Sequence, residues 1–213
     1  MKRTAFVASI AIVTLAVGAA GQESRSEIAL QGTGLFTKQS AGKDVNGGGV
    51  TETADNTGGF LVSYRYRLSH WLSAEGSYGL AHDGFHYATG YGLYDGTGYV
   101  NQMTGNFVMN LASSAREKFS PYLLLGAGAL IFSPPGAGFE VAGNSQRKVA
   151  GTQQSKGAFV YGVGTDFALT KHFSLRTEYR GLIYHTPDFG VSTFSMGSFT
   201  HSAQPSAGLV FRF

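Results

Sequence analysis

The stretch GFLVSYRYRL, residues 59–68, alternates between two kinds of side chain. One parity is apolar and aromatic: Phe60, Val62, Tyr64, Tyr66 and Leu68. The other parity is small or charged and includes Arg65 and Arg67. A period of two predicts a β-strand whose two faces meet different surroundings. The period alone does not say whether the apolar face is turned toward a protein core or toward lipid.

The same period recurs along the chain. It is clear in residues 173–184 and 202–213, and weaker in residues 28–36, 71–81, 99–111 and 157–169. Residues 122–132 are apolar on both parities, so periodicity leaves the orientation of this segment open. Together these segments predict eight strands.

The predicted connections alternate in length. Short ones occupy residues 69–70, 112–118 and 170–172, whereas long, Gly-rich ones occupy residues 37–56, 82–98, 133–153 and 186–199. An even number of strands joined by alternating short turns and long loops is typical of bacterial outer-membrane barrels. A soluble sandwich gives no reason for this alternation. The sequence therefore predicts an all-β fold, an eight-stranded antiparallel up-and-down transmembrane β-barrel with its apolar faces outward.

The first residues predict export. Residues 1–3 are a short basic start, residues 4–16 are uncharged and mostly apolar, and residues 18–21 are small. This is the pattern of a secretory signal peptide, and the apolar run is shorter than the roughly 18 to 20 residues that cross a bilayer. We therefore expect a signal peptide at residues 1–20 and a barrel domain at residues 21–213. After cleavage, the barrel would lie in the outer membrane of a Gram-negative-type bacterium.

The composition excludes several classes of protein. The chain has 213 residues and no Cys, which rules out disulfide scaffolds, thiolate metal sites, iron–sulfur clusters and cysteine nucleophiles. It has 31 Gly, 16 Phe and 11 Tyr but only 14% charged residues, a mixture that disfavours a helical bundle. Without Lys2 and Arg3, 14 basic residues face 13 acidic ones, so nothing suggests nucleic acid as a partner.

Three further segments carry a resemblance. They are PYLLLGAG at residues 121–128, FSLRTEYR at residues 173–180 and GLVFRF at residues 208–213. With the signal peptide, they resemble the outer-membrane β-barrel domain family, the small eight-stranded barrels similar to OmpA and OmpX, over essentially the whole mature chain. The resemblance implies outer-membrane lipids as surroundings and both termini in the periplasm. It also implies that the barrel-assembly machinery recognises the last strand, with Phe211 and Phe213 as the assembly signal.

Charged residues recur on the parity opposite to the apolar one. They are Arg65, Arg67, Glu75, Asp166, Arg176, Glu178, Arg180 and Arg212. Side chains just fill the interior of an eight-stranded barrel, so these groups are expected to pair across the lumen as a structural ion-pair network that plugs it. The alternative is a conducting gate.

Aromatic residues gather in the second long connection. Phe85, Tyr87, Tyr91 and Tyr94 are candidates for a contact surface toward an extracellular ligand or another cell. The alternative is that some of them extend the strands as part of an interfacial girdle.

Two groups of polar residues invite a chemical interpretation. His82 and His86 have a metal-like spacing beside Asp83, but we expect this segment to be a strand end entering a loop, and so predict no metal and no cofactor. A lipid-acting hydrolase needs a nucleophile and a base within hydrogen-bond reach, and the spacing of His185, Ser192 and Ser195 does not provide this. No catalytic residues are expected.

The sequence thus predicts an integral outer-membrane barrel with a structural or surface-interaction role, carried by four long extracellular loops. The loops would hold whatever specificity for an extracellular ligand exists. The alternative functions are a narrow pore or transporter for small solutes and, less favoured, a lipid-modifying enzyme. A fold does not by itself determine a function.

Overall fold

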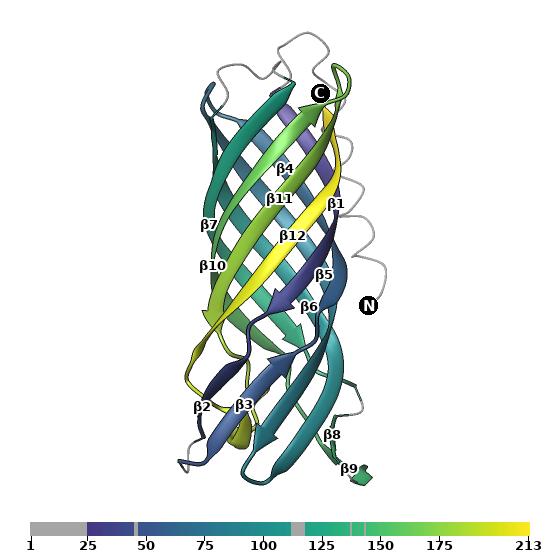
Figure 1. Ribbon diagram of the computed structural model, residues 1–213, viewed down its shortest axis with the longest axis vertical. Coiled ribbons are helices and arrows are strands. Elements are labelled where there is room, and N and C mark those ends of the chain that lie inside the picture. Colours follow the sequence, from purple (N-terminus) through teal and green to yellow (C-terminus); the bar gives the residue numbers. More distant parts are fainter. Residues whose placement is uncertain (1–24, 45–46, 112–117, 137, 143) are drawn as a thin grey trace, which may run out of the picture.

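A computed structural model describes residues 25–44, 47–111, 118–136, 138–142 and 144–213, so the predicted signal peptide at residues 1–20 lies outside the described residues. Eight long strands form the wall of a closed barrel (Figure 1). They are β1 (Ser26–Thr37), β4 (Thr57–Arg67), β5 (Leu72–Thr89), β6 (Gly92–Asn110), β7 (Phe119–Ser133), β10 (Gln154–Ala168), β11 (Phe173–His185) and β12 (Phe199–Arg212). Every neighbouring pair is antiparallel, and Leu30 of β1 pairs with both Val62 of β4 and Leu209 of β12. The predicted eight-stranded antiparallel barrel is confirmed.

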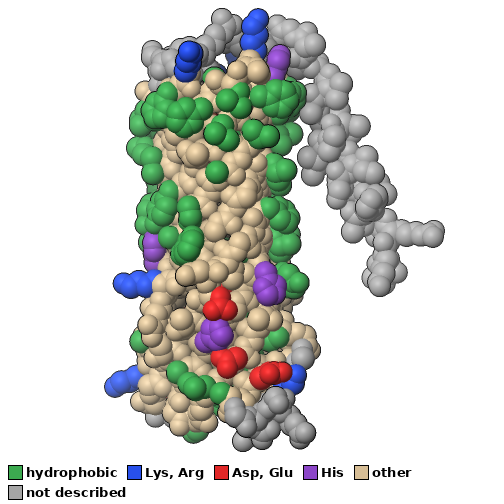
Figure 2. Space-filling view, turned by 45° about the vertical axis from the view of Figure 1, so that its right-hand side comes forward, with side chains coloured by type: hydrophobic (Ala, Val, Ile, Leu, Met, Phe, Trp, Pro, Cys, Tyr) green, Lys and Arg blue, Asp and Glu red, His purple; other side chains and the backbone are tan. Residues whose placement is uncertain are grey.

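Side chains alternate across the barrel wall. Tyr64 and Tyr179 are 46% and 38% exposed on the outside, whereas Ser63 and Arg65 are buried inside. Figure 2 shows hydrophobic side chains on the wall and charged ones near its two ends. This is the exterior that a lipid bilayer requires. No helix of the described residues is long and apolar enough to span a membrane.

The structure also shows which side chains of residues 122–132 face inward, a point that the periodicity left open. Within β7, Tyr122, Leu124, Leu130 and Phe132 are buried in the interior, and Leu123 and Leu125 are exposed outside. The Tyr122 ring fits inside because its pairing partner on the neighbouring strand β10 is Gly164, which has no side chain. A Cβ atom there would lie 2.4 Å from the Tyr122 hydroxyl.

The prediction of a long loop at residues 82–98, the second long connection, is wrong. β5 and β6 continue as paired strands to a tight turn at residues 90–91. Two of its glycines sit where a side chain would collide with neighbouring atoms, since a Cβ at Gly98 would lie 2.1 Å from the Ser133 carbonyl oxygen. One at Gly84 would lie 2.1 Å from a carboxylate oxygen of Asp55. Glycines that suggested a loop therefore permit a continuous sheet.

Four short strands widen this hairpin into a sheet beyond the barrel. β3 (Gly49–Ala54) pairs with β5, and β2 (Ser40–Lys43) pairs with β3. On the other side, β8 (Phe139–Val141) pairs with β6, and β9 (Asn144–Val149) pairs with β8. We call these four strands, with residues 83–98 of β5 and β6, the extension. It lies at the end of the barrel opposite the C-terminus (Figure 1).

The last long connection folds back into the barrel mouth. It contains one short 3₁₀ helix, η1 (Ser192–Phe194), and its Phe189 and Phe194 are fully buried. Phe189 adopts the left-handed backbone conformation, with φ 51°, which is uncommon for a residue with a side chain. The following amide of Gly190 donates to the Asp188 carboxylate at 3.1 Å and holds this turn. The turn directs the Phe189 ring inward.

These rings join others from the strands. Phe85, Tyr87, Phe132, Phe139, Phe189 and Phe194 form one buried cluster, which we call the aromatic plug. Tyr87 stacks on Phe194 with ring centroids 4.2 Å apart, and Phe85 meets Phe189 edge to face at 5.0 Å. Such contacts stabilise beyond simple burial of area, so the plug closes the long-loop end of the barrel.

The apolar residues on the outside of the barrel wall predict that a charge placed among them destabilises the protein, by an amount that depends on its depth in the membrane. Val163 is half exposed on β10, midway between the outward Phe159 and Phe167. We expect Val163→Lys to lower the free energy of unfolding in lipid vesicles by about 2–4 kcal/mol. Ala88→Lys also changes an exposed strand residue, but Ala88 lies in the part of β5 that belongs to the extension, so the free energy of unfolding should hardly change. Equal losses in chemical denaturation of the two variants would contradict a lipid-facing belt.

Candidate functional site

The short-turn half of the lumen holds a buried network of ion pairs. Its four arginines and four carboxylates are Arg65, Arg176, Arg180, Arg212, Glu27, Glu75, Asp166 and Glu178. They come from β1, β4, β5, β10, β11 and β12, so the network ties together strands far apart in the sequence. The equal numbers of opposite charges leave no net charge on the network.

Glu75 joins two of the arginines. One of its oxygens accepts from Arg65 at 2.8 Å, and the other accepts from Arg180 at 2.8 Å. The same carboxylate also accepts from the Asn106 amide at 3.2 Å. Arg180 in turn donates to Glu178 and to the Ser77 hydroxyl. Because every one of these groups is buried, each charge relies on its partners in place of water.

Asp166 and Glu27 organise the arginines nearer the short-turn end. Arg176 binds both oxygens of Asp166, at 2.7 and 2.9 Å, in the bidentate geometry that favours Arg over Lys. Arg212 reaches Asp166 at 2.9 Å and Glu27 at 3.2 Å. Glu27 also contacts Arg65 at 3.3 Å, which links this group to the one around Glu75.

Tyr122 packs against the centre of the network. The Arg65 guanidinium lies 4.3 Å from its ring centroid, and that of Arg176 lies 5.4 Å away. Its hydroxyl donates to Glu178 at 2.6 Å. The ring therefore covers two guanidinium planes while its polar end binds a carboxylate. Sequence periodicity missed Tyr122 because both parities of its segment are apolar.

The structure changes the predicted membership of the network in two places. Glu27 belongs to it, because β1 begins at Ser26, before the residue 28 at which periodicity began the strand. Arg67 shares the inward parity but lies at the end of β4, where it is only partly buried. No ion pair joins it to another residue in the part of the chain that the structure describes.

A polar layer lies between the network and the aromatic plug. Gln204 donates to Gln102 at 2.9 Å across the lumen, and Gln31 donates to Ser206 at 2.9 Å. Beside them, a small cavity lined in part by Leu182 has room for about one water molecule. Charges, amides and aromatic rings thus fill the lumen in three successive layers.

Two of the four predicted contact aromatics lie inside the molecule. Phe85 and Tyr87 are each 1% exposed and belong to the aromatic plug, so their prediction as surface contacts is wrong. They alternate inward along β5 as it continues beyond the barrel. Tyr94 is partly buried against the same cluster, and Tyr91, at the turn of the hairpin, is exposed.

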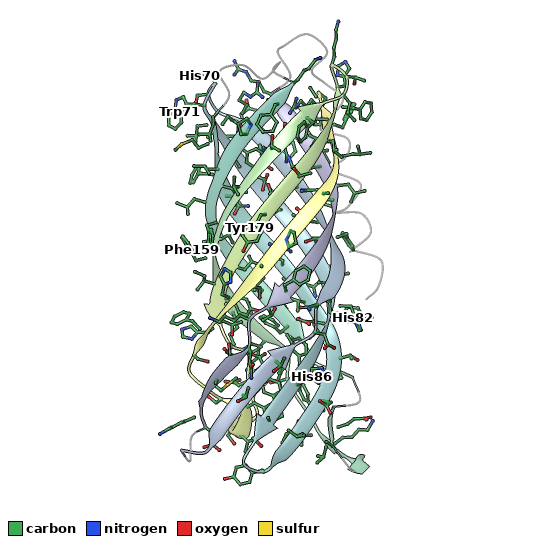
Figure 3. All side chains as sticks on the ribbon, viewed as in Figure 1. His70, Trp71, His82, His86, Phe159 and Tyr179 are labelled. Carbon is green, nitrogen blue, oxygen red and sulfur yellow. The ribbon has the colours of Figure 1, made fainter. Side chains whose placement is uncertain are left out.

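His82 and His86 share the outer face of β5 (Figure 3). They stand within a strand and not at the predicted strand end. His86 lies between two carboxylates, with Nδ1 2.6 Å from Asp95 and Nε2 3.2 Å from Asp55. Partial burial opposes the charged ring, but the two hydrogen bonds raise the pKa of His86 above its usual value. No three His, Asp or Glu residues in the described segments are grouped as metal ligands.

Glu52 is a second titratable group of the extension. It is buried in β3 beside the aromatic plug and accepts a hydrogen bond from Tyr87 at 3.2 Å. Burial raises the pKa of Glu52 to about 8, although the Tyr87 bond opposes this shift. The carboxyl group is therefore largely neutral at physiological pH.

The remaining candidates lie apart from one another. His185 packs on Phe199, with ring centroids 3.9 Å apart, while Ser192 belongs to η1. No hydrogen bond joins His185 to Ser192 or Ser195 within the described ranges. Phe211 is exposed on the outer wall near the short turns, where its ring meets those of Phe173 and Phe213.

Comparisons with known proteins agree with this geometry. A model of the family described as outer membrane protein beta-barrel domain matches residues 5–201. OprG from Pseudomonas aeruginosa has a similar structure, with a TM-score of 0.62 at 13% identity, covering 88% of this chain and 95% of that one. Neisserial surface protein A gives 0.54 at 14% identity, covering 89% and 98%.

A third similar structure is Ail, the attachment invasion locus protein of Yersinia pestis, in complex with the heparin analogue sucrose octasulfate. Its TM-score is 0.53 at 21% identity, covering 90% of this chain and all of that one. At such identities these likenesses show the fold alone. A comparison with curated proteins gives no match.

The network predicts a large cost for breaking it. Glu75→Ala removes the carboxylate that Arg65 and Arg180 share and leaves one positive charge of the buried network uncompensated, so we expect the free energy of unfolding to fall by about 3–5 kcal/mol. The control is Glu140→Ala, because the Glu140–Lys148 pair is exposed and contributes at most about 1 kcal/mol. Chemical denaturation in lipid would contradict the prediction if both variants lost the same amount.

The extension is predicted to loosen as pH rises. A raised pKa for His86 means stability that is complete below about pH 6.5 and lost as pH rises through the folded-state value. Glu52 acts in the same direction, because its carboxyl group ionises near pH 4.5 in the unfolded chain but stays protonated up to about pH 8 in the folded one. Hydrogen-exchange protection of β3, corrected for the intrinsic rate, should therefore fall across this interval.

The double variant Glu52→Gln, His86→Gln should weaken that dependence, and Asp83, whose pKa burial raises to about 7, accounts for the part that remains. Glu140→Gln, which changes an exposed carboxylate of the same extension, should leave the dependence unchanged. Protection factors that increase with pH in the unmutated protein would disprove the assignment.

Proposed function

The chain belongs to the outer membrane protein beta-barrel domain family, and we propose that it is a closed barrel that acts through its extension and not as a pore. As such a barrel, it resides in the outer membrane of a Gram-negative bacterium. In barrels of this kind the short turns face the periplasm and the longer loops face outward. The extension is accordingly its extracellular part.

The filled lumen is the observation that carries this proposal. Four arginines and four carboxylates pair across the short-turn half of the lumen, and the aromatic plug closes its long-loop end. Ions crossing this interior would have to displace paired charges and then pass a layer of packed rings. Both steps oppose conduction, because the charged groups have no water to replace their partners.

The extension supports a role in surface contact. A cross-strand row runs over its outer face through five strands: Thr53, His86, Asp95, Glu140 and Lys148. The aromatic plug packs beneath the sheet, so this face is held in shape before any partner arrives. Pre-organised surfaces bind at a lower entropic cost than mobile loops.

The charges on this face favour a particular kind of partner. Asp55 and Asp95 flank His86, and Glu140 pairs with Lys148 at 2.9 Å. A polysulfated ligand like the one bound to Ail would meet these carboxylates, so we do not transfer that ligand class to this face. We infer instead a polar, uncharged or cationic partner surface.

Planar-bilayer recording tests the closed barrel. We expect no steady conductance from the unmutated protein, with flotation of proteoliposomes confirming that it has inserted. Glu75→Ala combined with Glu178→Ala and Phe189→Gly removes partners from the network and a ring from the plug, and should admit leak currents. Stable single-channel steps in the unmutated protein would overturn the proposal and establish a narrow pore.

A further inference from the structure

At their extracellular ends, the outward faces of four barrel strands change from uncharged to basic side chains. Along β1, β5, β11 and β12, the outward residues are uncharged across the barrel wall. On each strand, the first outward residue after that run is basic. These residues are Lys38, His82, His185 and His201.

The lengths of these runs place three of the basic residues, Lys38, His82 and His201, at one depth. From Ile28 to Lys38, from Leu72 to His82 and from Phe211 to His201, each interval is ten residues. At roughly 3.3 Å per residue and a tilt of roughly 40°, this spans about 25 Å along the barrel axis. That is the height of the apolar band of such barrels, so these side chains reach the level of the outer-leaflet head groups.

Two of the four are direct neighbours. The backbone amide of Lys38 donates to the carbonyl of His201 at 2.9 Å, which continues the pairing of β1 with β12. Both residues follow the outward parity of their strands, on which Phe36 and Leu209 are exposed. No carboxylate of the described residues pairs with the Lys38 ammonium group.

Tyr161 of β10 completes the group from across β11. Its hydroxyl lies 2.8 Å from Nε2 of His201, and their rings stack with centroids 6.0 Å apart. The side chain can cross β11 because Gly181 lies beneath it, where a Cβ atom would approach the Tyr161 ring to 2.3 Å. When the hydroxyl donates to Nε2, the ring proton of His201 lies on Nδ1 and remains available as a donor.

The surroundings suit a lipid. Phe36 of β1 and Phe159 of β10 are both exposed on strands that carry the site, at the extracellular edge of the apolar belt. An amphiphile here would place acyl chains along these rings and its head group beside Lys38. His82 offers no such site, since its neighbour is the ring of Tyr99 at 5.1 Å, with no lysine paired beside it.

We propose that Lys38, His201 and Tyr161 form a site on the outer wall of the barrel for the phosphate group of an outer-leaflet glycolipid. The ammonium group supplies charge, and the imidazole and phenol supply hydrogen bonds. The site anchors the barrel to its leaflet on the β10–β12 side. It is independent of the lumen and of the extension's outer face.

Native mass spectrometry of the detergent-solubilised protein, titrated with lipid A, tests this site. Lys38→Gln should weaken binding about fivefold, as expected for one lysine at an anionic membrane surface. Tyr161→Phe should weaken it to a smaller extent. The matched control is Lys43→Gln, which removes an exposed lysine from β2, outside the membrane level.

Two further ligands, lipid A without its phosphates and inorganic phosphate, test whether the site binds the phosphate of a lipid or free phosphate. Lipid A stripped of its phosphates should bind no better to the unmutated protein than lipid A does to Lys38→Gln. Equal binding of the stripped lipid, or equal losses in Lys38→Gln and Lys43→Gln, would overturn the site. Displacement of lipid A by inorganic phosphate alone would overturn its assignment to a lipid.

Discussion

The pairing of β1 with β12 is the constraint on which the rest of the molecule depends. In hydrocarbon, every backbone N–H and C=O group must be bonded within the protein, and only closure of the sheet removes its edges. Here one register runs from Glu27 opposite Arg212 to Thr33 opposite Ser206 and resumes from Phe36 opposite Ala203 to Thr37 opposite Ser202. Closure with eight strands also sets the width of the lumen, which admits side chains but little else.

That narrow lumen determines which interior is stable. Each inward charge is removed from water, and burying it is tolerated only with partners at hydrogen-bond distance. The balance of four arginines against four carboxylates answers this requirement, and Tyr122 covers two of the guanidinium groups. Gly164 makes room for that ring, so a small residue on β10 is as much a part of the network as the charges are.

Beyond the membrane, the same inward parity serves another purpose. Phe85 and Tyr87 continue the inward row of β5, and the turn at Phe189 adds rings from the last connection. Water surrounds the outside of this part, so its outer face carries polar residues and its core is apolar, the reverse of the barrel below. Glu52 and His86 respond to pH here because both lie where burial and nearby charges compete with solvation.

The sequence by itself determined the strands, their number and the outward apolar face, because a period of two is visible in any strand whose two faces meet different solvents. It also indicated that residues such as Arg65 and Glu178 point inward. Tertiary structure alone decided which charges meet, that Glu27 joins them while Arg67 does not, and that Phe85 and Tyr87 are buried. The reason is that parity gives the face of a residue but neither its depth nor its neighbours across the lumen. Those follow from the register of strands that are distant in the chain, and from close approaches that make glycines such as Gly84 and Gly98 part of a sheet.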